Sequence, residues 1–293
     1  MRQPSSRTSP APGLAPYAFL LPAVLLWLIF QAYPLVCSLY LSLHHTAPGG
    51  ARTFVGLQNF GFLLNDPRFW LAVAHTLGFT IAYLVVQIPC ALALAVLLNH
   101  PNVRWASASR FAFLSTYLVG PVFVGLLFAQ LFRRDGFVIG TLASMGVDID
   151  PFNSPVLALP LTLLAALWLS TGLATTYLSA SMRRIDPQLY DSATVDGAGG
   201  WRRFWHVTLP GVRPVLAFLL LAGAVVSLQL FELPYVLFQG AGPRSSALTI
   251  VMYLFIAFFA GDVGYASAVA WTLVALIVVV GLPLWKMARG WRV

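Results

Sequence analysis

The chain contains several apolar stretches of twenty or more residues that carry almost no charge. No charged residue occurs between Arg7 and Arg52, for example. About 20 apolar residues in a helix cross the roughly 30 Å hydrocarbon layer of a membrane, and these runs lack the alternation of barrel strands. Only 9% of the residues are charged, whereas a soluble domain has about 25%. The sequence therefore predicts an all-α, polytopic membrane protein.

Six of the apolar stretches are long enough to be membrane-spanning helices. We place them near residues 17–43, 70–98, 111–132, 156–180, 215–238 and 265–285. A seventh stretch, Ala247–Ala260, has fourteen residues and would extend about 21 Å as a helix. Its length favours a re-entrant or surface-lying helix over a seventh span.

The distribution of basic residues favours six spans with both termini in the cytoplasm. In that topology twelve Arg and Lys residues and three Asp residues face the cytoplasm, and the outer loops hold five basic and five acidic residues. This split follows the positive-inside rule. A seventh span would move the three basic residues of the C-terminal segment outside and weaken the bias. Topology thus accounts for the basic composition, and we expect no nucleic-acid partner.

The N-terminal residues 1–16 are rich in Pro and Ser and are expected to form a disordered cytoplasmic tail. Residues 17–293 are expected to form one transmembrane domain. A cleavable signal peptide is the alternative interpretation, but its apolar core would run about 7–15 residues. The uncharged run is much longer here, which favours an uncleaved first span.

Residue types that carry catalysis or bind metals are few and scattered. Cys37 and Cys90 fall within predicted spans without metal-ligand spacing, which favours core packing. The five histidines form no plausible metal set with carboxylates or cysteines. The only lysine, Lys286, precedes Met287, so the chain has no GxxxxGK[ST] loop for ATP phosphates. We expect no enzyme activity, cofactor or metal, and no ATP hydrolysis by this chain.

The polar segment, residues 182–214, lies between the fourth and fifth predicted spans. It contains three of the nine acidic and five of the seventeen basic residues. Asp186 followed by Pro187 is typical of a helix N-terminus, and the glycines at 197, 199 and 200 are expected to end that helix. Charge concentrated in one internal loop indicates that this loop binds a soluble partner.

A second short helical turn is expected to follow those glycines. It would carry Trp201, Phe204 and Trp205 at helical spacing. Pro210 and Pro214 would close the unit before the next apolar run. We interpret the polar segment as a helix–turn–helix between two spans.

The run YDSATVDGAGGWRRFWHVTLPGVRP resembles the EAA loop of bacterial ATP-binding-cassette importer permeases. It is most similar to the carbohydrate-uptake branch (maltose and glycerol-3-phosphate type, binding-protein-dependent), whose pattern is YEAAxxDGAxxxxxFxxIxLPxLxP. The matching positions are Tyr190, Ala193, Asp196, Gly197, Ala198, Phe204, Leu209, Pro210 and Pro214. Asp191, Ser192 and Val207 replace Glu, Ala and Ile, which are departures conservative in charge or size.

The resemblance extends over nearly the whole chain. APYAFLLPAVLLWLIFQAYPLVCSLYLSL resembles the first span of the family, and FVGLQNFGFLLNDPRFWLAVAHTLGFT its first outer segment. FELPYVLFQGAGPRSSALTIVMYLF and GYASAVAWTLVALIVVV resemble its C-terminal third. Several matching segments in the right order are more specific than an isolated EAA-like string.

The resemblance implies that the helix Pro187–Val195 docks into a groove on a separate ATPase. The coupling residues would be Tyr190, Asp191, Ser192, Ala193, Asp196, Gly197, Ala198, Leu209 and Pro210. It also implies a heterodimer with a second, homologous permease, two ATP-binding-cassette ATPase subunits and an extracytoplasmic solute-binding protein. The permease would lie in the bacterial cell (inner) membrane, in contact with membrane lipid. The near-neutral outer face does not favour an anionic solute, so we expect sugar uptake. The alternative for the polar segment is a loop that only sets topology.

Three residues of the fifth predicted span are candidates for the substrate path. Gln229, Glu232 and Tyr235 lie at i, i+3 and i+6, and the first two would share a helix face. An amide, a carboxylate and an aromatic ring suit a polyhydroxylated ligand. Alternatively, Glu232 satisfies a neighbouring helix terminus or a polar group of the partner permease.

A self-sufficient secondary carrier or channel for a small solute is the alternative function. Such a protein would have internal inverted repeats and several intramembrane charges. The sequence shows no such repeat, and Glu232 is the one clear charge inside a predicted span. A sensor or scaffold would leave the loop motif unexplained.

Overall fold

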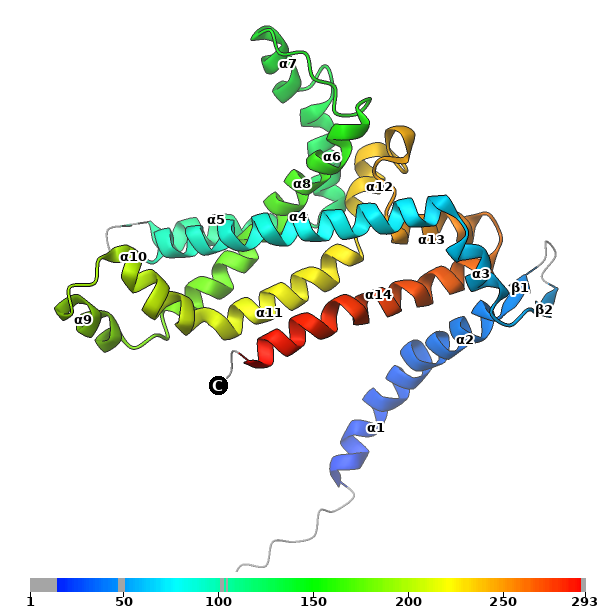
Figure 1. The fold of residues 1–293 in the computed structure, drawn as a ribbon, viewed down its shortest axis with the longest axis horizontal. Coiled ribbons are helices and arrows are strands. Elements are labelled where there is room, and N and C mark those ends of the chain that lie inside the picture. The colour runs from blue at the N-terminus through cyan, green and yellow to red at the C-terminus, as the bar shows by residue number, and fades with distance from the viewer. Residues whose placement is uncertain (1–14, 47–50, 101–102, 104, 291–293) are drawn as a thin grey trace, which may run out of the picture.

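The computed structural model describes residues 15–46, 51–100, 103 and 105–290. Its elements, in chain order, are α1 (Ala15–Trp27), η1 (Leu28–Ala32), α2 (Tyr33–Ser42), β1 (His44–Thr46), β2 (Arg52–Phe54), α3 (Gln58–Leu64), α4 (Pro67–Leu98), α5 (Ala106–Leu118), α6 (Pro121–Phe132), α7 (Phe137–Ser144), α8 (Pro155–Met182), α9 (Pro187–Val195), α10 (Gly200–Arg203), η2 (Phe204–Thr208), α11 (Leu209–Leu228), α12 (Glu232–Phe238), η3 (Pro243–Ser245), α13 (Ile250–Phe259) and α14 (Val263–Gly290). The long helices α4, α11 and α14 run along one axis, with α9 and α10 at one end and the β1–β2 hairpin at the other (Figure 1).

Five helices in the described part of the chain are long and apolar enough to cross a membrane. They are Phe19–Ser42, Pro67–Leu98, Pro155–Met182, Gly200–Leu228 and Val263–Gly290. A bent pair, α5 with α6 and α7, makes a sixth if it counts as one span. The prediction of a polytopic helical protein is confirmed, while the exact count of six and the orientation stay predictions. A short antiparallel hairpin, in which His44 pairs with Phe54, departs from the expected all-α fold.

The segment 111–132, predicted as one span, is broken in the middle. α5 ends at Leu118, α6 begins at Pro121, and the helical segments on either side are bent by 96°. Pro121 has no N–H to donate to the carbonyl four residues earlier, and its ring disfavours a helical conformation at the preceding residue. Gly120 takes up the turn with a φ of 83°.

The segment 215–238 is likewise two helices, because α11 ends at Leu228 and α12 begins at Glu232. Pro234 cannot donate to the carbonyl of Leu230 and would clash with it in a continuous helix. The Thr249 hydroxyl donates to this carbonyl oxygen instead, at 2.7 Å. Phe231, with φ −145° and ψ −56°, marks the break.

The seventh apolar stretch forms α13, a ten-residue helix that extends only about 15 Å. Thr249 caps its N-terminus by accepting a hydrogen bond from the N–H of Met252 at 3.3 Å. The N–H of Ile250 donates to Thr76 Oγ1 on α4 at 3.0 Å. The helix is thus tied to α4 and is too short to cross a hydrocarbon layer, as expected.

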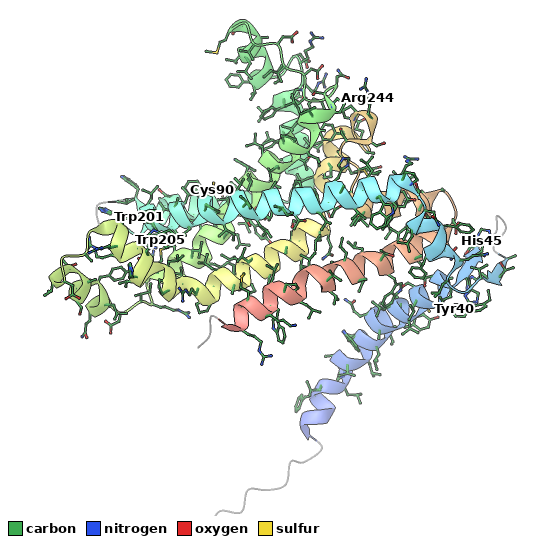
Figure 2. The ribbon with its side chains drawn as sticks, in the orientation of Figure 1. Tyr40, His45, Cys90, Trp201, Trp205 and Arg244 are labelled. Carbon is green, nitrogen blue, oxygen red and sulfur yellow. The ribbon has the colours of Figure 1, made fainter. Side chains whose placement is uncertain are left out.

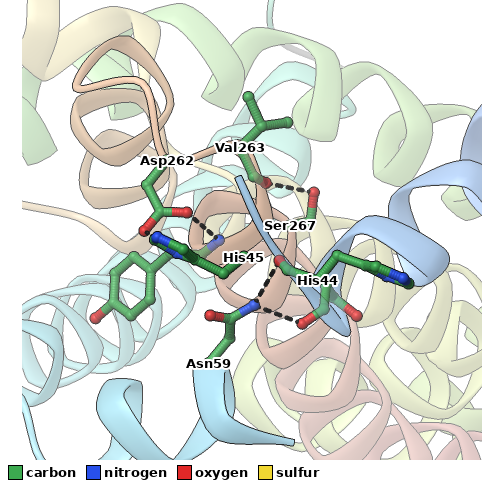
Figure 3. A network of polar contacts seen from close by, with 8 residues as sticks. His44, His45, Asn59, Asp262, Val263 and Ser267 are labelled. Atoms are coloured by element: carbon green, nitrogen blue, oxygen red, sulfur yellow. Dashed lines mark hydrogen bonds and ion pairs between the residues drawn. The ribbon is translucent and has the colours of Figure 1, made fainter. Parts of the chain in front are cut away.

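The N-terminal span has no buried residue in its most apolar window, but α2 packs on α14. The residues that follow α2 are held by polar contacts. Asn59 Nδ2 donates to the carbonyls of Ser42 and His44, at 2.8 and 3.0 Å. His45 lies 3.8 Å from Asp262, just before α14 (Figure 3). The predicted tail, residues 1–16, lies outside the described residues except for its last two, which begin α1.

The cysteine prediction holds only in part. Cys37 is half-buried on α2, whereas Cys90 is exposed on α4 (Figure 2). On α4, Gln87, Ala91 and Ala95 form the buried stripe at a spacing of four residues, and Cys90 faces away from it. Core packing within this chain is therefore wrong for Cys90.

Candidate functional site

The N-terminus of α9 forms as the sequence predicts. The helix spans Pro187–Val195, with proline in its first turn. The Asp186 carboxylate accepts a hydrogen bond from the N–H of Gln188 at 2.9 Å. A side-chain cap of this kind stabilises a helix by about 1 kcal/mol, so this short helix is well defined without a buried residue of its own.

The C-terminus of α9 closes in a Schellman motif. The N–H of Ala198 donates to the carbonyl of Ala193 at 2.9 Å, and the N–H of Gly197 donates to that of Thr194 at 3.0 Å. This motif needs a left-handed residue after the helix, and Gly197 has φ 73°. An added Cβ at Gly197 would meet no atom within 4 Å, so backbone conformation, not space, requires glycine here.

The helix α9 has two different faces. Its outer face borders an open groove of about 450 Å³ lined by Gln188, Asp191, Ser192, Val195 and Asp196. All five side chains are exposed, and Val195 is 88% exposed. Small, acidic and apolar groups on a protruding short helix suit insertion into a concave protein surface.

The inner face of α9 contacts the rest of the polar segment. Tyr190 Oη lies 3.0 Å from Thr208 Oγ1 in η2, within hydrogen-bonding distance, and Thr208 is buried. Arg203 Nη1 donates to Thr194 Oγ1 at 3.2 Å. α9 is therefore fixed to the helix that follows by two side-chain bonds. Thr208 and Thr194 were not predicted, because contacts across a turn leave no local sequence pattern.

The expected closure of the unit at Pro210 and Pro214 is wrong. Helix geometry continues from Gly200 to Leu228 through both prolines. A π-helical turn, η2, precedes Pro210, and the N–H of Leu209 bonds to the carbonyl of Phe204 within it. The wider turn accommodates a residue that has no N–H. The polar segment thus runs straight into the next span without a loop.

Two of the predicted coupling residues, Leu209 and Pro210, lie at the start of α11 and not on the outer face of α9. Leu209 packs against the buried cluster that includes Leu178, Met182 and Val212, and Pro210 is half-buried beside it. Trp201 and Trp205 lie at the same end of the molecule as α9 (Figure 2), where each stacks on or abuts Phe204. The structure therefore separates the exposed outer face of α9 from the partly buried residues at the start of α11.

A cavity of about 540 Å³ opens beside the two helix breaks. Its lining residues are Phe79, Tyr83, Tyr117, Pro121, Ala166, Leu169, Ser170, Val226, Ser227, Gln229, Leu230, Phe231, Glu232, Leu233 and Val251. They come from α4, α5, α6, α8, α11, α12 and α13 and from the break between α11 and α12. A cavity lined by aromatic rings, with a few polar groups, suits an organic ligand of small or intermediate size.

The three predicted substrate-path residues do not share one helix. Gln229 is the C-cap residue that follows α11, and Glu232 begins α12; both line the cavity. Tyr235 does not line the cavity and packs against Phe231 and Phe255, with ring centroids 5.2 and 5.3 Å apart. The assumed i, i+3, i+6 spacing is wrong because the helix breaks between Gln229 and Glu232.

Tyr83 and Ser170, which line the cavity, form a polar cluster with Gln87 that was not predicted. Tyr83 Oη and Gln87 Nε2 both donate to Ser170 Oγ, at 2.8 and 3.1 Å. Ser170 in turn donates to the carbonyl of Ala166 at 2.7 Å. The signal was present, since Tyr83 and Gln87 lie one helical turn apart within an apolar run. Within the described residues no group of three or more His, Cys, Asp or Glu side chains is placed to hold a metal ion.

Comparison with known proteins gives consistent matches. Residues 87–284 match the family model described as binding-protein-dependent transport system inner membrane component. The chain is 32% identical to the lactose transport system permease protein LacF of Rhizobium radiobacter, over 93% of each protein. It is 31% identical to the arabinooligosaccharides transport system permease protein AraP of Bacillus subtilis, over 95% of this chain and 90% of that protein.

The fold also matches a solved structure. A chain in the crystal structure of a bacterial ABC transporter that imports the acidic polysaccharide alginate has a TM-score of 0.84 and 25% identity, covering 94% of this chain and 95% of that chain. A second structure of bacterial alginate ABC transporter, in complex with an alginate pentasaccharide-bound periplasmic protein, has the same fold.

Proposed function

The chain belongs to the family of binding-protein-dependent transport system inner membrane components, and we propose that it forms half of the translocation pathway of a sugar importer. It is a transporter permease and not an enzyme, and ATP is hydrolysed on a separate subunit. The observation that carries the proposal is the unbroken helix from Gly200 to Leu228. It connects the contacts of α9 at one end with the cavity at the other.

Coupling follows from this geometry as rigid-body movement. The outer face of α9, with Asp191, Ser192 and Asp196, docks into a groove on the ATPase. Displacement of α9 passes through the Tyr190–Thr208 and Thr194–Arg203 contacts to η2 and α10. From there α11 moves as one body and changes the cavity next to Gln229. Leu209 and Pro210 act at the root of this lever and do not touch the partner.

The cavity at the two helix breaks is the proposed solute path. Sugars present hydroxyl groups for hydrogen bonds and apolar faces that pack on aromatic rings. Gln229 and Glu232 supply the first kind of contact, and Tyr117 and Phe231 supply the second. The sugar permeases among the relatives support this class of solute. Tyr235 supports the wall through Phe231.

Membership of the family supports an assembly of several subunits. The chain pairs with a second, homologous permease, binds two ATPase subunits through α9 and its counterpart, and receives solute from an extracytoplasmic binding protein. It resides in the bacterial cell (inner) membrane, with α9 and both termini in the cytoplasm. The distribution of basic residues supports this orientation.

Purification of the tagged full chain from its native membrane tests the proposal. An ATPase subunit and a second permease are expected to co-elute with the wild-type chain. Reversal of the acidic docking face by Asp191→Lys and Asp196→Lys is expected to release the ATPase and to retain the second permease. Elution of the wild-type chain alone under conditions that preserve membrane complexes would contradict the proposal.

A further inference from the structure

A second cavity, of about 770 Å³, lies between the inner face of the polar segment and the ends of α4 and α8. It is distinct from the solute path and shares no lining residue with it. Arg110, Arg183 and Arg203 line it from three different elements or their ends. Asp and Glu are absent from its described lining.

The three guanidinium groups make hydrogen bonds only to neutral acceptors in the described part of the chain. Arg110 Nη2 donates to the carbonyl of Leu98 at 2.7 Å and to Asn99 Oδ1 at 3.2 Å. Arg183 Nε donates to the same Asn99 oxygen at 3.3 Å, and Arg203 Nη1 donates to Thr194. Arg110 Nε is buried with no hydrogen-bond partner among the described atoms.

The acidic residues of the polar segment do not compensate this charge. Asp191 and Asp196 line the groove on the opposite face of α9, and Asp186 caps the N-terminus of that helix. The ion pairs found among the described residues join Arg133 to Asp135, Arg134 to Asp148 and His45 to Asp262, away from this cavity. A partly enclosed space with three uncompensated positive charges attracts an anion strongly.

We propose that this cavity binds the headgroup of an anionic phospholipid. Phosphate oxygens match the fork of N–H donors on a guanidinium group, and Arg110 Nε offers a donor that no described group accepts. The bound headgroup bridges the ends of α4 and α8 to Arg203 and thereby holds the inner face of the polar segment in place.

A lipid fits this cavity better than a small soluble anion for two reasons. The cavity lies where α4 and α8 end, at the level expected for a membrane surface, and basic pockets between spans at this level bind anionic headgroups. The rest of its wall is partly apolar, with Val96, Leu98 and Met182 beside the arginines. Such a wall matches the glycerol and first methylenes that follow a lipid phosphate.

Native mass spectrometry of the purified full chain tests this inference without any partner subunit. The chain is equilibrated in detergent with equal amounts of phosphatidylglycerol and phosphatidylcholine, and the bound lipids are counted. The wild-type chain is expected to retain phosphatidylglycerol preferentially. Arg110→Gln, Arg183→Gln and Arg203→Gln together are expected to lower this preference roughly a hundredfold, at about fivefold for each arginine.

The matched control removes the same charge outside the cavity, by Arg184→Gln, Arg202→Gln and Arg213→Gln, which are exposed side chains. Preference for phosphatidylglycerol retained in the control supports a built site, and an equal loss in both triple variants overturns it. Arg203→Gln alone, which leaves the Asn99 contacts intact, is expected to lower the preference about fivefold even if the triple variant fails to fold.

Two further outcomes would also overturn the inference. Displacement of phosphatidylglycerol by added inorganic phosphate would assign the cavity to a soluble anion. An absence of lipid preference in the wild-type chain, together with weaker ATPase binding by the cavity variant, would assign the cavity to a protein partner.

Discussion

Gly197 fixes the end of α9 through its backbone conformation alone. A β-branched residue at φ 73° costs more than the roughly 1–2 kcal/mol of an ordinary left-handed residue, so Gly197→Val is expected to open the Schellman motif and abolish uptake. Gly197→Asn is the matched control, because Asn tolerates this conformation. Uptake and the amount of chain in the membrane are measured for both. Full uptake by Gly197→Val would rule out a coupling role for this turn.

Tyr190 and Thr208 are expected to act as one contact. Tyr190→Phe leaves the buried Thr208 hydroxyl without this partner, a loss of about 1–3 kcal/mol, and uptake is expected to fall several-fold. Thr208→Val alone should lower uptake similarly. The double variant should be no worse than the more impaired single variant, because both substitutions remove the same bond. Independent, multiplicative losses in uptake assays would show that the two residues act separately.

Glu232 is expected to contact solute at the start of α12. Glu232→Gln keeps the shape and removes the charge, so uptake is expected to change in its preference among sugars while the subunits still co-purify. Tyr235→Phe is the control, since Tyr235 does not line the cavity, and it should leave the preference unchanged. Loss of assembly with Glu232→Gln would instead support the structural role considered for this carboxylate.

At the scale of elements, the sequence does not predict which prolines break a helix. Pro121 and Pro234 break their spans, whereas Pro89, Pro160 and Pro283 lie inside continuous helices. The difference depends on distant partners, such as Thr249, which bonds the carbonyl that Pro234 leaves free. The caps and bounds of α9 were predictable because each depends on residues within one or two turns. The cavity was not predictable, because it forms where the break between α5 and α6 meets the break between α11 and α12.

The close packing of α5 on α8 gives a prediction at the same scale. A Cβ on Gly172 would lie 1.8 Å from the carbonyl oxygen of Phe113, so Gly172→Ala forces the two helices apart and should lower the thermal unfolding temperature clearly. Gly140→Ala in α7, where a Cβ meets nothing within 4 Å, should leave it unchanged or raise it slightly. Thermal unfolding in detergent measures both, and equal stability of the two variants would contradict the packing.

At the scale of the whole molecule, the proposed mechanism depends on three parts that move together: α9, the continuous helix Gly200–Leu228 and the cavity. The membrane class, the positions of most spans and the family could be predicted from apolar length, charge and the EAA-like motif. The continuity of the helix from Gly200 to Leu228 could not be predicted. Pro210 and Pro214 are residues that commonly end helices, and the π-helical turn that accommodates Pro210 has no clear sequence signal. In the proposed mechanism, that continuity transmits ATP-driven movement of α9 to the cavity.

The most direct measurement is ATP hydrolysis by the assembled complex in liposomes, with its binding protein and a panel of sugars. We expect one sugar class to stimulate hydrolysis and to accumulate in the lumen, and Gly197→Val to abolish accumulation while the complex stays intact. Accumulation of solute by the chain alone, without an ATPase subunit, would contradict the account.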